Sequence, residues 1–293
     1  MHKSGFVNII GNPNVGKSTL MNALVGERLS IITSKAQTTR HRIMGIVNGE
    51  DFQIVYSDTP GILKPSYKLQ ESMMKFVKGA VSDADVILYV TDTVEQSDRS
   101  AEIVERIAAS GIPTIVVVNK IDLTTPDKLE ALVEKWHAIL PNAEIARASA
   151  KEGFNIGGIF DSILRLLPEG EPFYPKDTLT DKTLRFFASE IIREKILLNY
   201  DKEIPYCCEI AIDSYKEEPT IDRIAATIYV TRDSQKGIII GHRGEMLKKV
   251  GTQARIDLEK FLGKKVFLEL FVKVGGDWRN DERQLRRFGY EQD

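Results

Sequence analysis

Cysteine is scarce in this 293-residue sequence, and the two that occur, Cys207 and Cys208, are adjacent. Neighbouring side chains of a strand point to opposite faces, so these thiols are poorly placed to form a disulfide with each other. No histidines cluster with them at the spacing of a zinc site. We expect ordinary core and surface residues, in a protein of a reducing compartment.

The sequence also lacks a strong net charge and any apolar run long enough to span a bilayer. Its formal net charge of -2 argues against a protein that coats nucleic acid over its whole surface, although a local basic patch stays compatible with it. No signal peptide is visible before the apolar segment that ends at Gly11. We therefore expect a cytoplasmic protein, long enough for two domains of ordinary size.

Up to about residue 168, short apolar runs alternate with longer segments of helical period. Uninterrupted apolar runs suit strands that helices cover on both faces, so this alternation predicts a doubly wound α/β domain. Asn48-Gly49 tolerates the positive φ angles of a tight hairpin turn, which predicts one antiparallel pair. The expected strands are Phe6–Ile10, Ile43–Val47, Phe52–Tyr56, Val86–Val90, Pro113–Val118 and Ala143–Ala148, and the expected helices are Ser18–Val25, Ser66–Val81, Ala101–Ala109, Asp127–Leu140 and Ile156–Leu167.

Three prolines and a glycine between Pro168 and Pro175 indicate a linker, because proline cannot continue a helix. Beyond it, a few helices and strands predict a smaller α+β domain. We expect helices at Thr183–Tyr200 (amphipathic) and Met246–Leu262, and strands at Tyr206–Asp213, Arg223–Val230 and Lys265–Val274. The predicted division is a first domain of residues 1–168, a linker of 169–180 and a second domain of 181–293.

Residues 11–18 match the pattern G-x-x-x-x-G-K-[ST] between an apolar strand and a helix. Backbone N–H groups of such a loop curl around phosphates, where the positive end of the helix also points. Lys17 should reach the β- and γ-phosphates, and Ser18 should place its hydroxyl on Mg²⁺. The loop alone does not distinguish ATP from GTP. The candidate phosphate-binding residues are Gly11, Asn12, Pro13, Asn14, Val15, Gly16, Lys17, Ser18 and Thr19.

Three further motifs, each at the end of an expected strand, make that distinction. In the first, Asp58 can hold the Mg²⁺ shell and Gly61 allows a backbone N–H to approach the γ-phosphate. In the second, the Asp122 carboxylate can accept two N–H bonds from the guanine edge, a pair that adenine does not offer. The third can donate a backbone N–H to the guanine O6. The motif residues are Asp58, Thr59, Pro60 and Gly61; Asn119, Lys120 and Asp122; and Ser149, Ala150 and Lys151.

A family resemblance is carried by the phosphate-binding loop of residues 11–18, the stretch Lys35-Ala36-Gln37-Thr38-Thr39-Arg40-His41-Arg42 and the sequence Asp-Thr-Pro-Gly. With these features the chain resembles the Era family of bacterial GTPases over nearly its whole length. The resemblance implies that residues 28–42 form the first switch loop and that Thr38 or Thr39 binds Mg²⁺. We favour Thr39, which gives Ser18, Thr39 and Asp58 as metal ligands and Lys17, Thr39, Asp58 and Gly61 as the catalytic set.

One departure from the Ras pattern concerns catalysis. Ras-like enzymes carry a water-orienting glutamine after this motif, whereas this chain has Ile62. We expect slow hydrolysis in cis, on the order of 10⁻⁴ to 10⁻² s⁻¹, unless a partner, RNA or a monovalent cation helps. Asn14 lies where related GTPases hold K⁺, and it is an equally ordinary turn residue.

In the second domain, Gly241-His242-Arg243-Gly244 follows an apolar segment and precedes a helix. A lone G-x-x-G is a weak signal, and a plain helix–turn–helix corner is the simple alternative. The basic residue in the loop and the order of the elements resemble a KH domain, whose GXXG loop clamps the backbone of about four nucleotides. The candidate RNA-binding residues are Gly241, His242, Arg243, Gly244, Lys248 and Lys249.

The resemblance extends to residues 277–290, where we expect Trp278, Leu285 and Phe288 to pack on the domain and Arg286 and Arg287 to reach RNA. It implies binding of single-stranded RNA near the 3′ end of small-subunit (16S) ribosomal RNA and a role in rRNA processing and subunit assembly. We also expect a monomer, and the resemblance allows weak peripheral association with the membrane. The main rival is a GTPase whose second domain binds protein; a nucleic-acid-binding protein that scarcely hydrolyses GTP and an ATPase or kinase are weaker ones.

Overall fold

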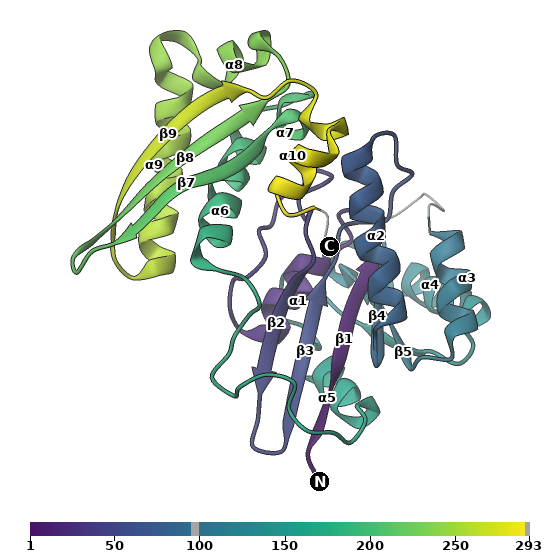
Figure 1. Ribbon diagram of the computed structural model, residues 1–293. Coiled ribbons are helices and arrows are strands. Elements are labelled where there is room, and N and C mark those ends of the chain that lie inside the picture. The colour runs from purple at the N-terminus through teal and green to yellow at the C-terminus, as the bar shows by residue number, and fades with distance from the viewer. Residues whose placement is uncertain (95–99, 291–293) are drawn as a thin grey trace. The chain divides into compact units, whose positions relative to one another are not determined.

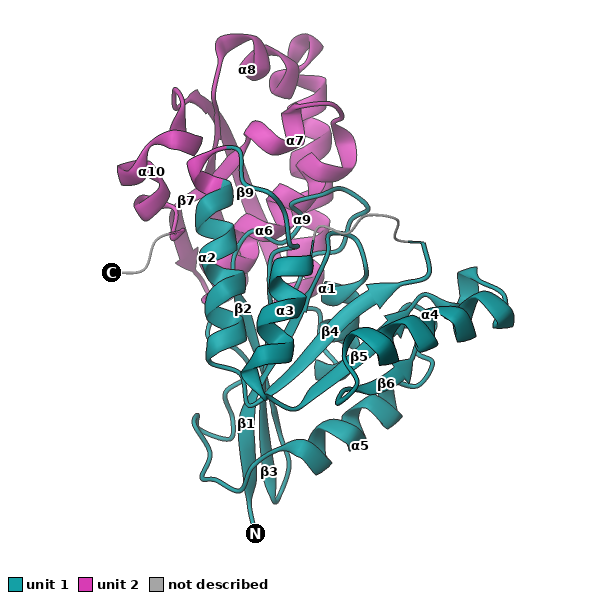
Figure 2. Ribbon diagram, turned by 90° about the vertical axis from the view of Figure 1, so that its right-hand side faces the viewer, with its two compact units in different colours: residues 1–66, 70–181 teal, residues 67–69, 182–293 magenta. Residues whose placement is uncertain are grey.

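The computed structural model describes residues 1–94 and 100–290. It divides into two compact units, which Figure 2 shows in different colours. The first comprises residues 1–66 and 70–181, and the second comprises residues 67–69 and 182–293. In the described part of the chain, no helix combines the length and the apolar character needed to cross a bilayer.

A six-stranded sheet forms the centre of the first unit (Figure 1). Its strand order is β2-β3-β1-β4-β5-β6, and all neighbours are parallel except β2 and β3. The strands are β1 (Lys3–Gly11), β2 (Ile43–Asn48), β3 (Phe52–Asp58), β4 (Val86–Asp92), β5 (Thr114–Asn119) and β6 (Glu144–Arg147). Since helices lie between the parallel strands in the sequence, the predicted doubly wound α/β fold is confirmed.

Helices cover both faces of this sheet. On one face, α2, α3 and α4 bury a continuous apolar cluster in which Met74, Ile103 and Trp136 pack on strands β4 and β5. On the other face α1 packs against α5, and Phe160 of α5 lies edge-on to Phe52 of β3. The helices are α1 (Lys17–Val25), α2 (Lys68–Ser82), α3 (Ala101–Ser110), α4 (Pro126–Ile139) and α5 (Ile156–Leu166).

The hairpin between β2 and β3 forms as an antiparallel pair, but its turn differs from the expected one. Neither Asn48 nor Gly49 has a positive φ angle, and Gly49 N–H donates to Phe52 O at 3.0 Å. A Cβ on Gly49 would lie 2.1 Å from the Phe52 ring. Glycine is therefore required here for space beside an aromatic ring.

The proline-rich segment after α5 is held against the first unit along the β2 edge. Ile46 N–H donates to Leu179 O at 2.8 Å, and Thr180 Oγ1 donates to Met44 O at 2.6 Å. Nearer its start, the backbone N–H groups of Phe173 and Tyr174 donate to Gln53 Oε1 at 2.7 and 2.9 Å. The segment thus continues the first unit as an ordered strap up to residue 181.

The second unit has a three-stranded sheet of order β7-β8-β9, with β7 and β8 antiparallel and β8 and β9 parallel. Helices α6 and α9 pack on one face of it, where Ile192, Ala254 and Val272 share an apolar core. The elements are α6 (Leu184–Asn199), α7 (Ile204–Cys207), β7 (Glu209–Glu217), β8 (Ile221–Val230), α8 (Asp233–Ile240), α9 (Glu245–Leu262), β9 (Lys265–Val274) and α10 (Glu282–Arg287). The predicted α+β class is confirmed.

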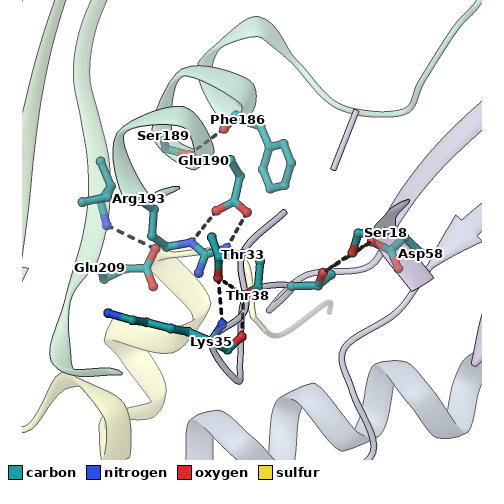
Figure 3. Close-up of polar contacts among 12 residues, drawn as sticks. Ser18, Thr33, Lys35, Thr38, Asp58, Phe186, Ser189, Glu190, Arg193 and Glu209 are labelled. Carbon is teal, nitrogen blue, oxygen red and sulfur yellow. Dashed lines mark hydrogen bonds and ion pairs between the residues drawn. The ribbon is translucent and has the colours of Figure 1, made fainter. Parts of the chain in front are cut away.

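Helix α6 is less amphipathic than expected, because charged residues on it are buried as well. Arg193 donates to both carboxylate oxygens of Glu190, at 2.7 and 2.6 Å (Figure 3). Lys195 pairs with Glu194 at 2.8 Å and with Asp257 of α9. Pairing of this kind offsets the cost of burying the charges.

The strand expected at Tyr206–Asp213 begins later, because Pro205 favours the first turn of a helix and α7 forms instead. As a result Cys207 and Cys208 precede the sheet, and both are buried as free thiols, so the expected surface cysteine is wrong. Each Sγ donates to Ile204 O, at 3.3 and 3.1 Å.

The C-terminal residues of the second unit contribute to its core. Trp278 and Leu285 are fully buried, as expected, and Trp278 Nε1 donates to Cys207 O at 3.0 Å. Phe288 lies edge-on to Trp278 with 5.7 Å between ring centroids. Tyr290, which was not expected to matter, is buried and donates to Glu209 Oε2 at 2.6 Å.

We predict that Leu285→Ala lowers the free energy of unfolding of the second unit by about 2–5 kcal/mol, through lost burial and a residual cavity. Trp278 fluorescence in urea measures it in a Trp136→Phe background, which leaves one indole in the chain. Leu198→Ala is the matched control, because Leu198 is 57% exposed. Equal destabilisation by the two variants would contradict a core role for the C-terminal segment.

Candidate functional site

A cavity of about 640 Å³ lies in the first unit. It is lined by the segments at the carboxyl ends of β1, β3, β5 and β6, and by residues of the 31–39 loop between α1 and β2. They include Pro13, Gly61, Asn119, Asp122 and Ser149. Ligands of open α/β sheets bind at this edge, and the four sequence motifs therefore meet around one space.

The loop from β1 to α1 depends on two glycines for close approach. A Cβ on Gly11 would lie 2.1 Å from Val90 O, and one on Gly16 would lie 2.2 Å from Asn119 Nδ2. Gly16 also has a φ of 100° and precedes the first turn of α1. Lys17 folds back over the loop, where Nζ donates to Gly11 O at 3.0 Å and to Asn12 O at 2.8 Å.

Three oxygen-bearing side chains meet at the start of α1, and Figure 3 shows two of them, Ser18 and Asp58. Ser18 Oγ donates to Asp58 Oδ2 at 2.6 Å, and it lies 2.9 Å from Thr39 Oγ1. Thr39 Oγ1 also donates to Asp58 Oδ2, at 3.3 Å. Hard cations such as Mg²⁺ prefer an oxygen set of this kind.

Asp58 is fully buried. Burial raises the pKa of its carboxyl, and the hydrogen bond from Ser18 and the charge of Lys17 lower the pKa in part. Among the described residues, Asp58 Oδ1 has no hydrogen-bond partner. A buried oxygen without a partner costs free energy, so these residues fit a divalent cation that would satisfy it.

The neighbouring threonine points elsewhere. Thr38 Oγ1 lies 2.6 Å from Thr33 Oγ1 and donates to Lys35 O at 2.6 Å, as Figure 3 shows. The structure therefore brings Thr39, and not Thr38, to Ser18 and Asp58.

The Asn119 side chain connects the loop after β1 with the loop after β6. Its Nδ2 donates to Val15 O at 2.9 Å, and its Oδ1 accepts from Ala150 N–H at 2.9 Å. Both amide atoms are thus used, and two loops distant in the sequence are held at a fixed spacing.

Lys120 and Asp122 follow Asn119 in the second motif. Lys120 has a φ of 58°, donates to Asn14 O at 2.6 Å, and pairs with Asp92 at 2.6 Å, a partner that no sequence signal had indicated. Asp122 lines the cavity, and its Oδ1 accepts from Ser149 Oγ at 2.6 Å. That hydrogen bond uses one of the two carboxylate oxygens of Asp122, and Lys151 lines the same cavity.

Several motif residues support the cavity without lining it. Thr59 Oγ1 donates to Ile9 O at 2.7 Å and is buried beneath the site. The other motif residues that do not line the cavity are Gly11, Asn12, Val15, Pro60 and Ala150. Asn14 lines the cavity, with Nδ2 donating to Ser34 O at 2.9 Å.

Gly61 and Ile62 are adjacent in the sequence but lie in different surroundings. A Cβ on Gly61 would lie 2.7 Å from Pro13 Cα, so this glycine lets the chain approach the phosphate-binding loop. Ile62 is 2% exposed and packs in the apolar cluster beneath α2. Its side chain therefore has no access to the cavity.

The Gly241–Gly244 loop in the second unit joins α8 to α9 through three residues of positive φ. These are Gly241 at 72°, Arg243 at 49° and Gly244 at 82°. A Cβ on Gly241 would lie 2.7 Å from Met246 Cβ. His242 and Arg243 are exposed at the tip of the turn.

A groove of about 390 Å³ runs from this loop between α9 and β9. Lys248 lines it and Lys249 does not, because consecutive helical positions differ by about 100°. The groove also uses residues that the sequence analysis missed, although their helical and alternating spacing carried the signal: Leu247, Gly251, Thr252, Arg255, Leu268 and Leu270. Arg287 lies outside it, with its guanidinium 5.5 Å from the centre of the Tyr229 ring.

Comparison with known proteins finds a family match in each of the two units. A family model described as "50S ribosome-binding GTPase" matches residues 6–120, and a "KH domain" model matches residues 203–279. GTPase Era of Syntrophus aciditrophicus (strain SB) is 46% identical over 295 residues, which cover 100% of this chain and 96% of that protein. The chain belongs to the Era family of GTPases.

Two solved Era structures are similar to this Era-family chain along its length. One is a crystal structure of Era in complex with MgGDPNP and nucleotides 1506–1542 of 16S ribosomal RNA, with 42% identity, full coverage of both chains and a TM-score of 0.95. The other is a single-residue variant of Aquifex aeolicus Era bound to GDP and AlF₄⁻, with 42% identity, coverage of 99% and 100%, and a TM-score of 0.95. As an Era-family protein, the chain binds guanine nucleotides and hydrolyses GTP, so the rival of an ATPase or kinase is set aside.

We predict that Asp58→Asn stabilises the protein in Mg²⁺-free and nucleotide-free buffer. The pKa of Asp58 is raised in the folded state, so the native carboxyl loses stability as pH rises from the unfolded pKa through the folded one. The asparagine variant does not titrate and keeps an acceptor for Ser18. Its advantage should therefore grow as pH rises above the unfolded pKa, by up to about 1.4 kcal/mol for each pH unit until the folded pKa is passed, and it should be larger at about pH 7.5 than at about pH 4.5.

Urea unfolding of the native protein and the variant at both pH values, with EDTA present, measures this advantage. Asp161→Asn, at an exposed position of α5, controls for the loss of a charge. An advantage that shrinks as pH rises would contradict a raised pKa at Asp58.

Proposed function

We propose that this Era-family GTPase is a GTP-controlled switch that binds the single-stranded 3′ end of small-subunit ribosomal RNA and assists rRNA processing and small-subunit assembly. The groove beside the Gly241–Gly244 loop carries the proposal, because it joins a backbone-clamping loop to an apolar floor with basic residues along one side. A relative that is 42% identical over the whole chain was crystallised with 16S ribosomal RNA.

In the first unit, Ser18, Thr39 and Asp58 would hold Mg²⁺, and their mutual distances of 2.6–3.3 Å support this assignment. Bound there, Mg²⁺ supplies positive charge to the β- and γ-phosphate oxygens. Lys17 would exchange its two backbone carbonyl acceptors for phosphate oxygens. The unpartnered Asp58 Oδ1 would be satisfied through the metal and its water shell.

Guanine would be read by Asp122, whose carboxylate accepts from the N1 and N2 donors of the base. Ser149 orients that carboxylate through its 2.6 Å hydrogen bond. Ala150 N–H is donated to Asn119, so we assign the guanine O6 contact to the N–H of Lys151. Asn14 is the candidate K⁺ ligand, through its side-chain oxygen at the cavity.

In the second unit, RNA phosphates would lie against the Gly241–Gly244 loop, with Lys248 and Arg255 along the strand. Bases would cover the apolar floor made by Leu268 and Leu270. A narrow groove of this kind suits a single strand whose bases are unstacked. His242 and Arg243, exposed on the loop, would contact the backbone at its tip.

GTP would act as the switch through the 28–42 loop. The γ-phosphate and Mg²⁺ order such loops, and hydrolysis releases them. Thr39 belongs to this loop and contacts both Ser18 and Asp58, so it would transmit the presence of the γ-phosphate. We further propose that the protein acts as a cytoplasmic monomer, with weak peripheral association with the membrane.

The proposal predicts that Lys248→Ala and Arg255→Ala weaken binding of an RNA corresponding to 16S nucleotides 1506–1542. Each variant removes one phosphate contact, so the slope of log K against log salt should fall by about 1. Fluorescence anisotropy at several salt concentrations, with the GTP analogue GDPNP or GDP bound, measures both affinity and slope.

Lys249→Ala is the matched control, because Lys249 lies one residue from Lys248 but does not line the groove. It should keep the native slope. Equal losses in all three variants would indicate a diffuse basic surface, and no RNA binding by the native protein would turn the search to a protein partner.

A further inference from the structure

GTP hydrolysis needs a polar group that orients the attacking water, and this chain lacks one at the position where Ras-like enzymes carry it. Ras-like enzymes orient the attacking water with a glutamine after the Asp-x-x-Gly motif. Here Ile62 occupies that position, 2% exposed and packed with Met74 and Val77 in the core.

A second cavity of about 480 Å³ lies beside the nucleotide cavity, between the switch loop and the start of α2. Three residues line both cavities and so form their shared wall: Pro13, Gln37 and Gly61. The proline side chain has no hydrogen-bonding group, and glycine has no side chain. Gln37 therefore supplies the one polar side chain on this wall in the part of the chain that the structure describes.

The position of the shared wall matches the route of an attacking water. In-line displacement requires water to approach the γ-phosphorus from the side opposite the β-phosphate. Gly61, the residue expected to face the γ-phosphate, borders both cavities. Gln37 is two residues before Thr39, whose hydroxyl lies 2.9 Å from that of Ser18.

The backbone at Gln37 has a conformation that glutamine rarely adopts. Its φ is 56°, in the left-handed region that favours glycine and asparagine. Hydrogen bonds across the turn hold it there, since Thr38 Oγ1 donates to Lys35 O at 2.6 Å and Lys35 N–H donates to Thr33 Oγ1 at 3.1 Å (Figure 3). Strain that surrounding contacts maintain is a feature of functional positions.

We propose that the Gln37 side-chain amide orients the attacking water in GTP hydrolysis, in place of the missing glutamine at position 62. Its Oε1 accepts from the water, and its Nε2 donates to a γ-phosphate oxygen. The water oxygen forms a bond to the γ-phosphorus, and the bond from that phosphorus to the β–γ bridging oxygen breaks. The electron pair leaves with GDP, and the water proton passes to the departing inorganic phosphate, so the amide stays neutral.

Gln37→Gly tests this role with little risk to folding, because glycine adopts a φ of 56° without strain. We expect the single-turnover rate of hydrolysis to fall about tenfold or more, as for other positioned groups in proton-transfer steps. Affinity for GDP and GDPNP should stay within about twofold of the native value. Gln37→Asn, which keeps an amide and tolerates the left-handed region, should recover part of the rate.

Lys64→Ala is the matched control, since Lys64 lines only the second cavity, and it should keep the native rate. Rates are measured with enzyme in excess over radiolabelled GTP, with and without the ribosomal RNA fragment. A native rate in Gln37→Gly under both conditions would overturn the proposal. A loss of rate with an equal loss of GDPNP affinity would also overturn it, because the side chain would then serve binding.

Discussion

One side-chain amide holds the nucleotide site of this protein together. Asn119 donates to Val15 O and accepts from Ala150 N–H, both at 2.9 Å, and so connects a phosphate-binding loop to a base-binding loop more than 100 residues apart in the sequence. The fit at this point leaves no spare room, because a Cβ on Gly16 would meet the Asn119 Nδ2 at 2.2 Å. The two loops are therefore held at a fixed distance, which suits the proposed ligand, since it carries both a phosphate and a base.

Around the Asn119 side chain, the position of each residue at the end of a strand determines what its side chain can contact. Asp58 ends β3 in full burial, where the raised pKa of its carboxyl and the unpartnered Oδ1 make a metal-free site unfavourable. Ile62, four residues later, belongs to the apolar core. In our proposal the phosphate-binding loop leaves orientation of the water to Gln37 of the switch loop, which links hydrolysis to the order of residues 28–42.

The sequence predicted the sheet, both fold classes and the four nucleotide motifs, because parallel strands and phosphate loops have strong local signals. It predicted less where the outcome depends on packing at a distance. Pro205 converts an expected strand into α7, Gly49 is required by the Phe52 ring, and the strap up to residue 181 is fixed by bonds to Gln53 and Met44. The groove in the second unit shows the same limit, since Lys248 and Lys249 are alike in sequence and differ only in the face of α9 they occupy.

The central claim is that Asp122, oriented by Ser149, recognises guanine. A change of the nucleotide base from guanine to xanthine tests this claim most directly. Asp122→Asn replaces an acceptor of the guanine N1 and N2 donors with a donor that suits the 2-carbonyl of xanthine. Equilibrium binding of fluorescent GTP and xanthosine triphosphate should show a loss of GTP affinity of at least about 100-fold, from two charge-assisted hydrogen bonds, together with tighter binding of xanthosine triphosphate. An unchanged preference for GTP would contradict the account.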